Sequence, residues 1–394
     1  MTQDAARHFA FLTFPDVGHL KPTLEVAREL AARGHRVTYL LDEDFAAMAA
    51  EAGAAVLGFA SGRRRYGDRS FEDIGSLGID YMERVIDTAL PLARKSFETD
   101  PPDVVVYDYE NFVAARALSH ELGIPSVQFF PYLASNDAFS LRGEMFQFDF
   151  DNALVQRTVG ILTGFLADND MPPEAIWTFA REYDERNLAF IPRRFQVKGE
   201  EFDDRFAFVG PCFAPAADLE WAPPDPDRRT VLISLGTEAN DQPELLAACA
   251  TAFAGEDWHV VLTLGRGRDT KALTSLGDNI EAHEWFPHTA LLPHVDVLVC
   301  HGGMTSTMEA LAYGVPVVVL PMTFENGLNG RQVAELGLGA LISGPETVTR
   351  EEIREAAERV AASAETRAAL AAMRAELEAA GGVAAACDYL EAAD

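Results

Sequence analysis

The chain has 394 residues, 48% of them apolar, and a formal net charge of −30. Single hydrophobic cores rarely grow beyond about 250–300 residues, so this length and apolar content predict two folded domains and exclude a disordered or fibrous chain. The large negative charge repels nucleic acids and anionic membranes, which argues against a polyanionic partner.

Cysteine spacing and hydropathy indicate the cellular compartment in which the chain is expected. The four cysteines, Cys212, Cys249, Cys300 and Cys387, are too far apart for a CxxC site and are typical of reduced, buried thiols. No stretch reaches the roughly 18 apolar residues of a membrane span, and the N-terminus has no basic region followed by a long apolar run. We therefore expect a cytoplasmic protein without a membrane span. The oligomeric state stays open, with a homodimer as one possibility.

The first half of the chain alternates apolar strands with amphipathic helices. The patterns predict a strand over 8–14, a loop over 15–22, a helix over 23–34 and a strand over 35–41. They then predict a strand over 103–108, a helix over 112–123 and a strand over 124–130. Residues 135–200 interrupt this alternation and are expected to be helical.

The alternation resumes after a Pro- and Asp-rich stretch at 211–228, which is the expected linker. Strands are predicted over 230–237, 259–264, 280–285, 295–300 and 315–321, and helices over 244–255, 305–314 and 351–393. The pattern indicates the α/β class, with two Rossmann-like, doubly wound domains facing across a cleft. The expected domains are residues 1–210 and 229–375, with a C-terminal helix at 376–394 packing back on the first domain.

The stretch CHGGMTSTMEA, residues 300–310, has features that a folded core does not require. His301 follows an apolar strand, Gly302 and Gly303 allow a tight turn, and a helix with hydroxyls in its first turn follows. The first N–H groups of a helix lack intrahelical acceptors, and the positive end of its dipole favours an anion. The stretch therefore indicates a phosphate site, with a Gly-Gly turn and a Ser306 helix cap as the alternative interpretation.

Residues 283–339, which contain this stretch, resemble the donor-binding signature of the UDP-glycosyltransferase superfamily, the family 1 glycosyltransferases of the GT-B fold. The N-terminal segment FLTFPDVGHLKPTLEVARELAARGHRVTYL, and the short motifs FVGPCF and SLGT, are similar to the same family. The resemblance is greatest to bacterial macrolide and natural-product glycosyltransferases. It implies the GT-B fold, with nucleotide-sugar binding in the second domain and acceptor binding in the first.

The resemblance also implies a role for individual residues of the second domain. Trp285 would stack on the donor base, His301 would contact the diphosphate, and Glu309 would bind the ribose hydroxyls. The sugar would be held by Glu325 and Asn326, where the family more often has Gln at the second position. The other implied donor-site residues are Ser234, Thr237, Gly303, Thr305 and Ser306.

The resemblance places the catalytic base on His19 in the first domain. Transfer to a hydroxyl group requires removal of its proton, and His is the usual base near neutral pH. The N-terminus of the following helix would disfavour the imidazolium and keep His19 neutral. Asp108 is the candidate to hold the other ring nitrogen, with an Asp that caps the next helix as the alternative.

The implied activity is that of an inverting, metal-independent hexosyltransferase. It would move glucose from UDP-glucose to a hydroxyl of a hydrophobic natural product such as a macrolide or polyketide. Residues 61–100 and 135–190 are expected to line the acceptor site, with Met145, Phe146 and Phe148 as candidate contacts. No cofactor is expected beyond the UDP- or TDP-linked sugar that serves as co-substrate.

Several alternatives remain open from the sequence. The chain could be a TDP-deoxysugar transferase of an antibiotic pathway, a non-catalytic helper of such an enzyme, or an epimerase of the same fold. The triplets Asp42–Asp44, Asp149–Asp151 and Asp225–Asp227 mimic a metal-holding DxD motif, but a chain with 62 acids contains such triplets by chance. GRGRDT at 265–270 lacks the third glycine of a dinucleotide-binding fingerprint.

Overall fold

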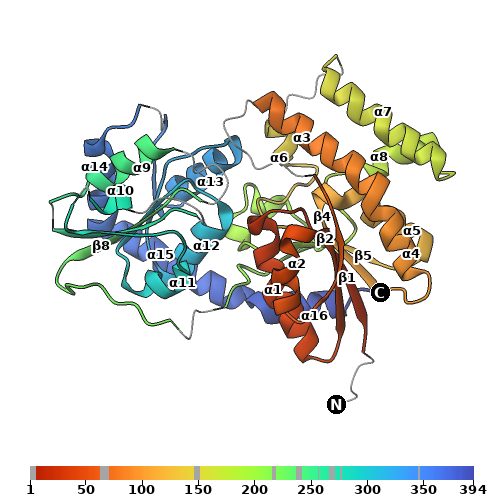
Figure 1. Ribbon diagram of the computed structural model, residues 1–394, viewed down its shortest axis with the longest axis horizontal. Coiled ribbons are helices and arrows are strands. Elements are labelled where there is room, and N and C mark those ends of the chain that lie inside the picture. The colour runs from red at the N-terminus through yellow and green to blue at the C-terminus, as the bar shows by residue number, and fades with distance from the viewer. Residues whose placement is uncertain are drawn as a thin grey trace. The chain divides into compact units, whose positions relative to one another are not determined.

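The computed structural model describes residues 6–62, 71–145, 151–214, 219–236, 242–255, 257–265, 271–275, 277–344 and 347–394 (Figure 1). These residues form two compact units. Unit 1 lies within 6–212 and takes in Ala380–Asp394, whereas unit 2 comprises Phe213–Ala379. The C-terminal segment thus belongs to the same unit as the N-terminal half.

Unit 1 is built on a seven-stranded sheet with the order β3-β2-β1-β4-β5-β6-β7, in which every pair is parallel. Its strands are β1 (His8–Leu12), β2 (Arg36–Asp42), β3 (Ala55–Phe59), β4 (Val104–Asp108), β5 (Ser126–Phe130), β6 (Asn187–Ala189) and β7 (Phe206–Phe208). Its helices are α1 (Val17–Ala32), α2 (Ala46–Glu51), α3 (Phe71–Arg84), α4 (Leu90–Phe97), α5 (Phe112–Leu122), α6 (Leu141–Met145), α7 (Ala153–Asp168), α8 (Ile176–Phe179) and α16 (Gly382–Glu391).

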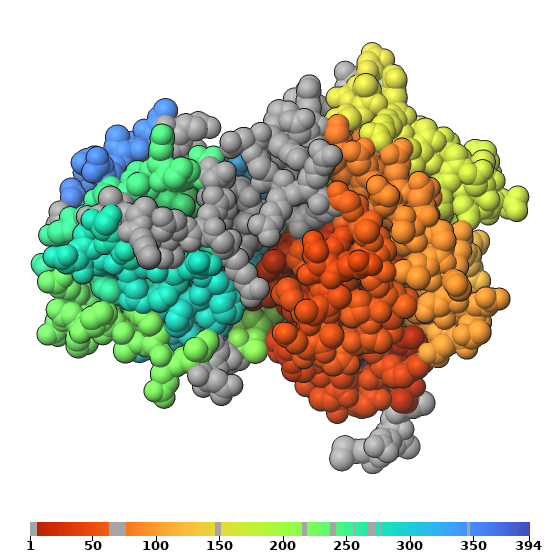
Figure 2. Space-filling model, in the orientation of Figure 1, coloured from red at the N-terminus to blue at the C-terminus, as the bar shows by residue number. Residues whose placement is uncertain are grey.

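The strands at the centre of this sheet are buried along their whole length. All residues of β1 and of β4 are buried, as expected for parallel strands covered on both faces. The apolar face of α1 packs over this sheet, and α16 lies against α1 (Figure 1). Helix α7 is more exposed, and its yellow atoms stand at the surface of unit 1 in Figure 2.

Three sequence expectations that concern unit 1 are wrong. The C-terminal helix expected over 376–394 is interrupted at Gly381, whose φ is +86°, so that one helix ends at Ala380 and α16 begins at Gly382. The loop expected at 15–22 is mostly helix, because α1 begins at Val17 and contains Pro22. Asp16 supplies the cap, since its carboxylate accepts a hydrogen bond from the N–H of Gly18 at 2.6 Å. The stretch 135–200 is not helical throughout, because β6 adds a buried strand to the edge of the sheet beside β5.

Unit 2 repeats the architecture with a six-stranded parallel sheet in the order β10-β9-β8-β11-β12-β13. Its strands are β8 (Arg229–Ser234), β9 (Trp258–Thr263), β10 (Ile280–His283), β11 (Val297–Cys300), β12 (Val317–Val319) and β13 (Gly339–Leu341). Its helices are α9 (Pro243–Thr251), α10 (Lys271–Thr274), α11 (His288–Leu291), α12 (Met304–Tyr313), α13 (Phe324–Glu335), α14 (Arg350–Ala362) and α15 (Ala364–Ala380). Two parallel α/β sheets confirm the fold class expected from the sequence.

The four cysteines are buried free thiols, and burial raises the pKa of Cys249 and of Cys300 to about 12. They therefore serve as apolar core residues. Among the described residues, the helices are all too short or too polar to cross a bilayer.

Helix α16 is tied to the start of the chain by both apolar and polar contacts. Leu390 is fully buried in the core of unit 1. The guanidinium of Arg7 donates to the carbonyl oxygens of Glu391 at 2.6 Å and Ala393 at 2.5 Å. On the exposed side, Arg33 pairs with Asp388 at 2.6 Å. The two ends of unit 1 thus fold as one core.

We predict that Leu390→Ala lowers the free energy of unfolding by about 2–4 kcal/mol, because it leaves a cavity between α16 and the sheet. Denaturant titration would measure the change. The control is Asp388→Ala, which removes an exposed ion pair and should cost less than about 1 kcal/mol. Equal losses from the two variants would contradict the packing role of α16.

Candidate functional site

The carboxyl ends of the central strands of unit 2 lie in register. Ser234 at the end of β8 pairs with Thr263 of β9 and with Cys300 of β11, and Cys300 pairs with Val319 of β12. The predicted donor-site residues that the structure describes end or follow these strands, except Trp285, which follows the parallel edge strand β10. Because the strands are parallel, these residues share one edge of the sheet, which is where open α/β sheets bind ligands.

The imidazole of His301 lies between the turns that contain Gly236 and Gly303. A Cβ atom added to Gly236 would lie 2.7 Å from Cε1 of His301, and one added to Gly303 would overlap its Nε2. Gly236 also has a φ of +83°, which other residues rarely adopt. The turn after Ser234 and the turn after Cys300 are therefore brought together by glycines that leave room for this ring. Thr237 lies outside the described residues.

Helix α12 begins directly behind His301. Gly303 is its N-cap and provides no side-chain cap, while Thr305 and Ser306 lie half-buried in the first turn. The N–H of Thr307 donates to the carbonyl oxygen of Gly303 at 3.0 Å, which closes the first turn of the helix on its cap. The amides before Thr307 point out of the helix end, where they and the dipole favour an anion.

Glu309 is only 1% exposed on the same helix. Its Oε2 lies 3.7 Å from Nδ1 of His288, whose Nε2 lies 3.0 Å from the hydroxyl of Thr263. A buried carboxylate needs such a partner, so His288 stabilises it. The sequence analysis did not single out His288, although it lies three residues after Trp285. Trp285 is 56% exposed.

The first turns of α13 contact the same edge. Thr323 caps this helix by accepting from the N–H of Asn326 at 3.2 Å, which places Glu325 in the first turn and buries Asn326. Asn329, fully buried one turn later, donates from Nδ2 to the carbonyl oxygen of Gly302 at 2.9 Å. Asn329 was not predicted from the sequence, and it joins α13 to the turn that contains Gly302.

In unit 1, His19 and Asp108 are in direct contact. Nδ1 of His19 lies 3.1 Å from Oδ2 of Asp108, which is completely buried, whereas the His19 side chain is 16% exposed. Asp108 also accepts from the backbone N–H of Phe14 at 2.6 Å and from Nδ2 of Asn111 at 2.8 Å. It makes no side-chain capping bond to the turn that follows. Since Nδ1 faces the carboxylate, Nε2 is the ring nitrogen left to accept a proton.

The electrostatics of His19 differ from the sequence expectation. Burial opposes a charge on the ring, but the hydrogen bond to Asp108 and the negative charges of Asp108, Asp16 and Glu110 outweigh it, so the pKa of His19 is raised above 6.5. This direction is opposite to the one expected from the N-terminus of the following helix. The cause is the group of carboxylates that folding places around this ring.

Two aromatic rings lie against His19 of the dyad formed by His19 and Asp108. The rings of Phe14 and Tyr132 have their centroids 5.1 and 5.5 Å from that of His19. Met145 is half-buried at the end of α6, while the other two predicted acceptor residues, Phe146 and Phe148, lie outside the described residues. Arg142 of α6 pairs with Glu110 at 2.6 Å and stacks on Tyr109 with its guanidinium carbon 4.2 Å from the ring centroid.

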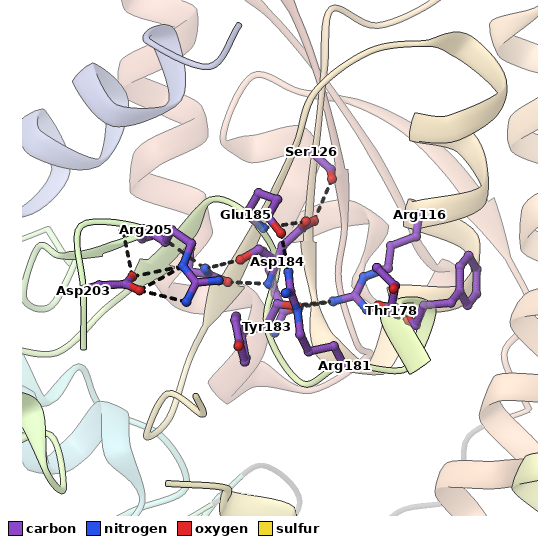
Figure 3. Close-up of polar contacts among 12 residues, drawn as sticks. Arg116, Ser126, Thr178, Arg181, Tyr183, Asp184, Glu185, Asp203 and Arg205 are labelled. Atoms are coloured by element: carbon purple, nitrogen blue, oxygen red, sulfur yellow. Dashed lines mark hydrogen bonds and ion pairs between the residues drawn. The ribbon is translucent and has the colours of Figure 1, made fainter. Parts of the chain in front are cut away.

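A second polar network holds the segment between α8 and β6. Arg116 of α5 donates to the hydroxyl of Tyr107 at 2.8 Å and to the carbonyl oxygen of Tyr183 at 3.1 Å. Asp184 accepts from the hydroxyls of Tyr107 and Ser126, each at 2.7 Å. Figure 3 shows Arg116 and Ser126 reaching this segment from neighbouring elements. The network fixes part of the region expected to line the acceptor site, yet none of its residues was singled out from the sequence.

The acidic triplets have local structural partners where they are described. Asp42 accepts from the N–H groups of Asp44 at 2.9 Å and Ser61 at 2.8 Å. Asp225 accepts from the N–H of Asp227 at 3.1 Å and lies 3.4 Å from Arg228. Both carboxylates therefore stabilise turns, while Asp149 falls outside the described residues.

Comparison with known proteins identifies relatives over nearly the whole chain. Residues 246–387 match a family described as erythromycin biosynthesis protein CIII-like, C-terminal domain. The chain is 37% identical to demethyllactenocin mycarosyltransferase of Streptomyces fradiae, over 98% of this chain and 86% of that protein. It is 31% identical to oleandomycin glycosyltransferase of Streptomyces antibioticus, over 99% of this chain and 92% of that protein.

A solved structure gives the same result. The chain resembles the crystal structure of CalG4, the calicheamicin glycosyltransferase, with a TM-score of 0.86, 34% sequence identity and 98% of each chain covered. At 34% identity the two chains are similar in sequence as well as in fold.

We predict that Gly236→Ala weakens the binding of UDP or TDP at least about 10-fold, because the added methyl group displaces the ring of His301. Isothermal titration calorimetry would measure the affinity. The matched control is Gly255→Ala in the same unit, which has a similar φ of +73° but nothing near its added Cβ. A loss of affinity in both variants, or in neither, would contradict the role assigned to the space around His301.

Proposed function

Because the chain belongs to the family 1 GT-B glycosyltransferases of antibiotic and natural-product type, we propose that it transfers a sugar from a nucleoside diphosphate to a hydroxyl group of a hydrophobic natural product. The observation that carries the proposal is the contact between His19 and the buried Asp108. A histidine held by a buried carboxylate is the arrangement that removes a proton from a hydroxyl nucleophile.

Unit 2 supplies the donor site in this proposal. Trp285 stacks on the base, and Glu309 accepts hydrogen bonds from the ribose. The diphosphate lies against His301 and the first amides of α12, including those near Thr305 and Ser306, so its negative charge is met by uncharged donors and one imidazole. The carboxylates of Asp42 and Asp225, from the described acidic triplets, stabilise turns. The transfer is proposed to proceed without a metal ion.

The chemistry is proposed to be a single displacement with inversion at the anomeric carbon. Nε2 of His19 takes the proton of the acceptor hydroxyl while its oxygen forms the new bond to that carbon. The bond between the carbon and the diphosphate oxygen breaks, and the leaving diphosphate keeps the electron pair. Asp108 stabilises the imidazolium that forms, and His301 with the α12 dipole stabilises the leaving group.

The donor is proposed to be a TDP-linked deoxysugar. Asn326 stands where the family more often has Gln, and its side chain is one methylene shorter and buried, so it reaches fewer sugar hydroxyls. A sugar with fewer hydroxyls suits such a site. Demethyllactenocin mycarosyltransferase, by its name, transfers a deoxysugar. UDP-glucose, the donor implied by the sequence resemblance, is the second candidate.

We predict that His19→Ala lowers kcat about 100-fold or more while TDP affinity changes less than about threefold, because the base and the donor site lie in different units. Steady-state kinetics and calorimetry would measure the two quantities. Full activity of the variant would contradict the base assignment.

The rate should also depend on pH. The base must be neutral to accept a proton, and its pKa is raised above 6.5, so kcat should rise with pH through a midpoint above 6.5. Asp108→Asn removes the negative charge that raises this pKa, so the midpoint should move to lower pH while kcat falls. A kcat that stays constant between about pH 5 and about pH 9 would contradict this account.

The donor is best identified with a panel of TDP-deoxysugars and UDP-sugars, offered with macrolide and polyketide acceptors and read by mass spectrometry. We predict the larger kcat/KM for a TDP-deoxysugar, by about 10-fold or more over UDP-glucose, and turnover that persists in EDTA. Consumption of donor sugar without any acceptor would instead indicate an epimerase. No turnover except in the presence of a partner protein would indicate a helper.

A further inference from the structure

A closed loop of contacts surrounds the carboxylate of Asp108. Nδ2 of Asn111 donates to its Oδ1 at 2.8 Å, and the hydroxyl of Tyr81 donates to Oδ1 of Asn111 at 3.1 Å. The Tyr81 ring then packs edge-on against Phe14, with centroids 4.8 Å apart, and the N–H of Phe14 donates to Oδ2 of Asp108 at 2.6 Å. The loop therefore starts and ends on the same carboxylate.

The side chains that form this loop of contacts are buried, and they fix the orientation of the Asp108 carboxylate. Tyr81, Asn111 and Asp108 are 6%, 2% and 0% exposed. Oδ1 is bonded to Asn111, while Oδ2 is bonded to Phe14 and to Nδ1 of His19. A carboxylate held by donors on both oxygens cannot rotate without breaking a buried hydrogen bond, which costs about 1–3 kcal/mol.

The orientation of the Asn111 amide follows from its neighbours. Its nitrogen faces a carboxylate that only accepts, and its oxygen faces the hydroxyl of Tyr81. Burial, together with the charge of Asp108, raises the pKa of Tyr81 well above its usual value, so the hydroxyl keeps its proton and donates. Tyr81 lies on α3, one turn before the π-helical turn Val85–Ala89, a feature common near functional sites.

We propose that Asn111 and Tyr81 are positioning residues for His19 that act through Asp108. This inference rests on the proposed role of His19 as the base. Asn111 fixes the carboxylate directly, and Tyr81 fixes both Asn111 and Phe14. Because Tyr81 is carried by α3, the placement of that helix is coupled to the orientation of the base.

The proposal predicts a direction of change. Asn111 draws negative charge toward Oδ1 and away from Oδ2, the oxygen that faces His19. Its loss leaves more charge on Oδ2, which stabilises the imidazolium and raises the pKa of His19. Removal of the Tyr81 hydroxyl weakens the hold of Asn111 on Oδ1 only indirectly. The pKa of His19 should therefore rise in that variant too, but by less.

The test is an NMR titration of the His19 imidazole in the full chain, with its resonance assigned from the His19→Gln variant. We expect the midpoint to rise by roughly half a pH unit or more in Asn111→Leu, and by a smaller amount in Tyr81→Phe. The acid limb of the kcat profile should move with it. kcat should fall about 3–30-fold, while KM for the donor stays within about twofold.

Matched controls separate positioning from loss of stability. Asn187→Leu removes a fully buried amide that bonds to the Asp184 backbone, and Tyr39→Phe removes a fully buried hydroxyl that bonds to Thr23. These controls should lower the unfolding temperature without moving the His19 midpoint. A His19 midpoint in Asn111→Leu and Tyr81→Phe that falls, or that stays within the spread of the controls, overturns the proposal.

The titration also separates this proposal from the proposed function. If the wild-type chain transfers no sugar from any donor in the panel, the glycosyl-transfer proposal fails. The His19 midpoints still decide whether Asn111 and Tyr81 control the imidazole through Asp108, because the titration does not depend on turnover.

Discussion

The reversal of strand order in each parallel sheet is the constraint on which the proposed chemistry depends. In each sheet the first strand, β1 or β8, is central, and the next two strands are added on one side of it. The following strand, β4 or β11, pairs with the other side of that first strand. The connections that leave these neighbouring strands run in opposite directions, and open α/β sheets bind their ligands at such points of the carboxyl edge. His19 and Asp108 flank this point in unit 1, and Gly236 and His301 flank it in unit 2.

Each unit also buries one carboxylate beside a histidine. Asp108 is fully buried against His19, and Glu309 is almost fully buried beside His288. Burying a carboxylate without partners costs several kcal/mol, so such groups persist in a core only when they are paired and hydrogen-bonded. The two acids differ in their surroundings. Asp108 is held by two further donors, whereas Glu309 is placed by the helix whose first turn is proposed to bind the diphosphate.

The sequence predicts the parts of this architecture that rest on local patterns. Continuous apolar runs locate the central strands, and Gly123 and Gly314 end α5 and α12 in the left-handed conformation. The start of α1 was missed because Pro22 suggests a loop, whereas the capping side chain of Asp16 sets the true boundary. Contacts over long sequence separations, such as that between Tyr81 and Asn111, leave no periodic signal and require the folded chain. The raised pKa of His19 likewise depends on acids that folding brings together.

The central claim is that the carboxyl edge of unit 2 holds the donor diphosphate, and a crystal structure of the chain grown with saturating TDP tests it most directly. The account predicts pyrophosphate oxygens within hydrogen-bond distance, about 2.7–3.2 Å, of His301 and of the first amides of α12, with the base stacked on Trp285. Nucleotide density elsewhere, or an empty edge at saturating nucleotide, would contradict it.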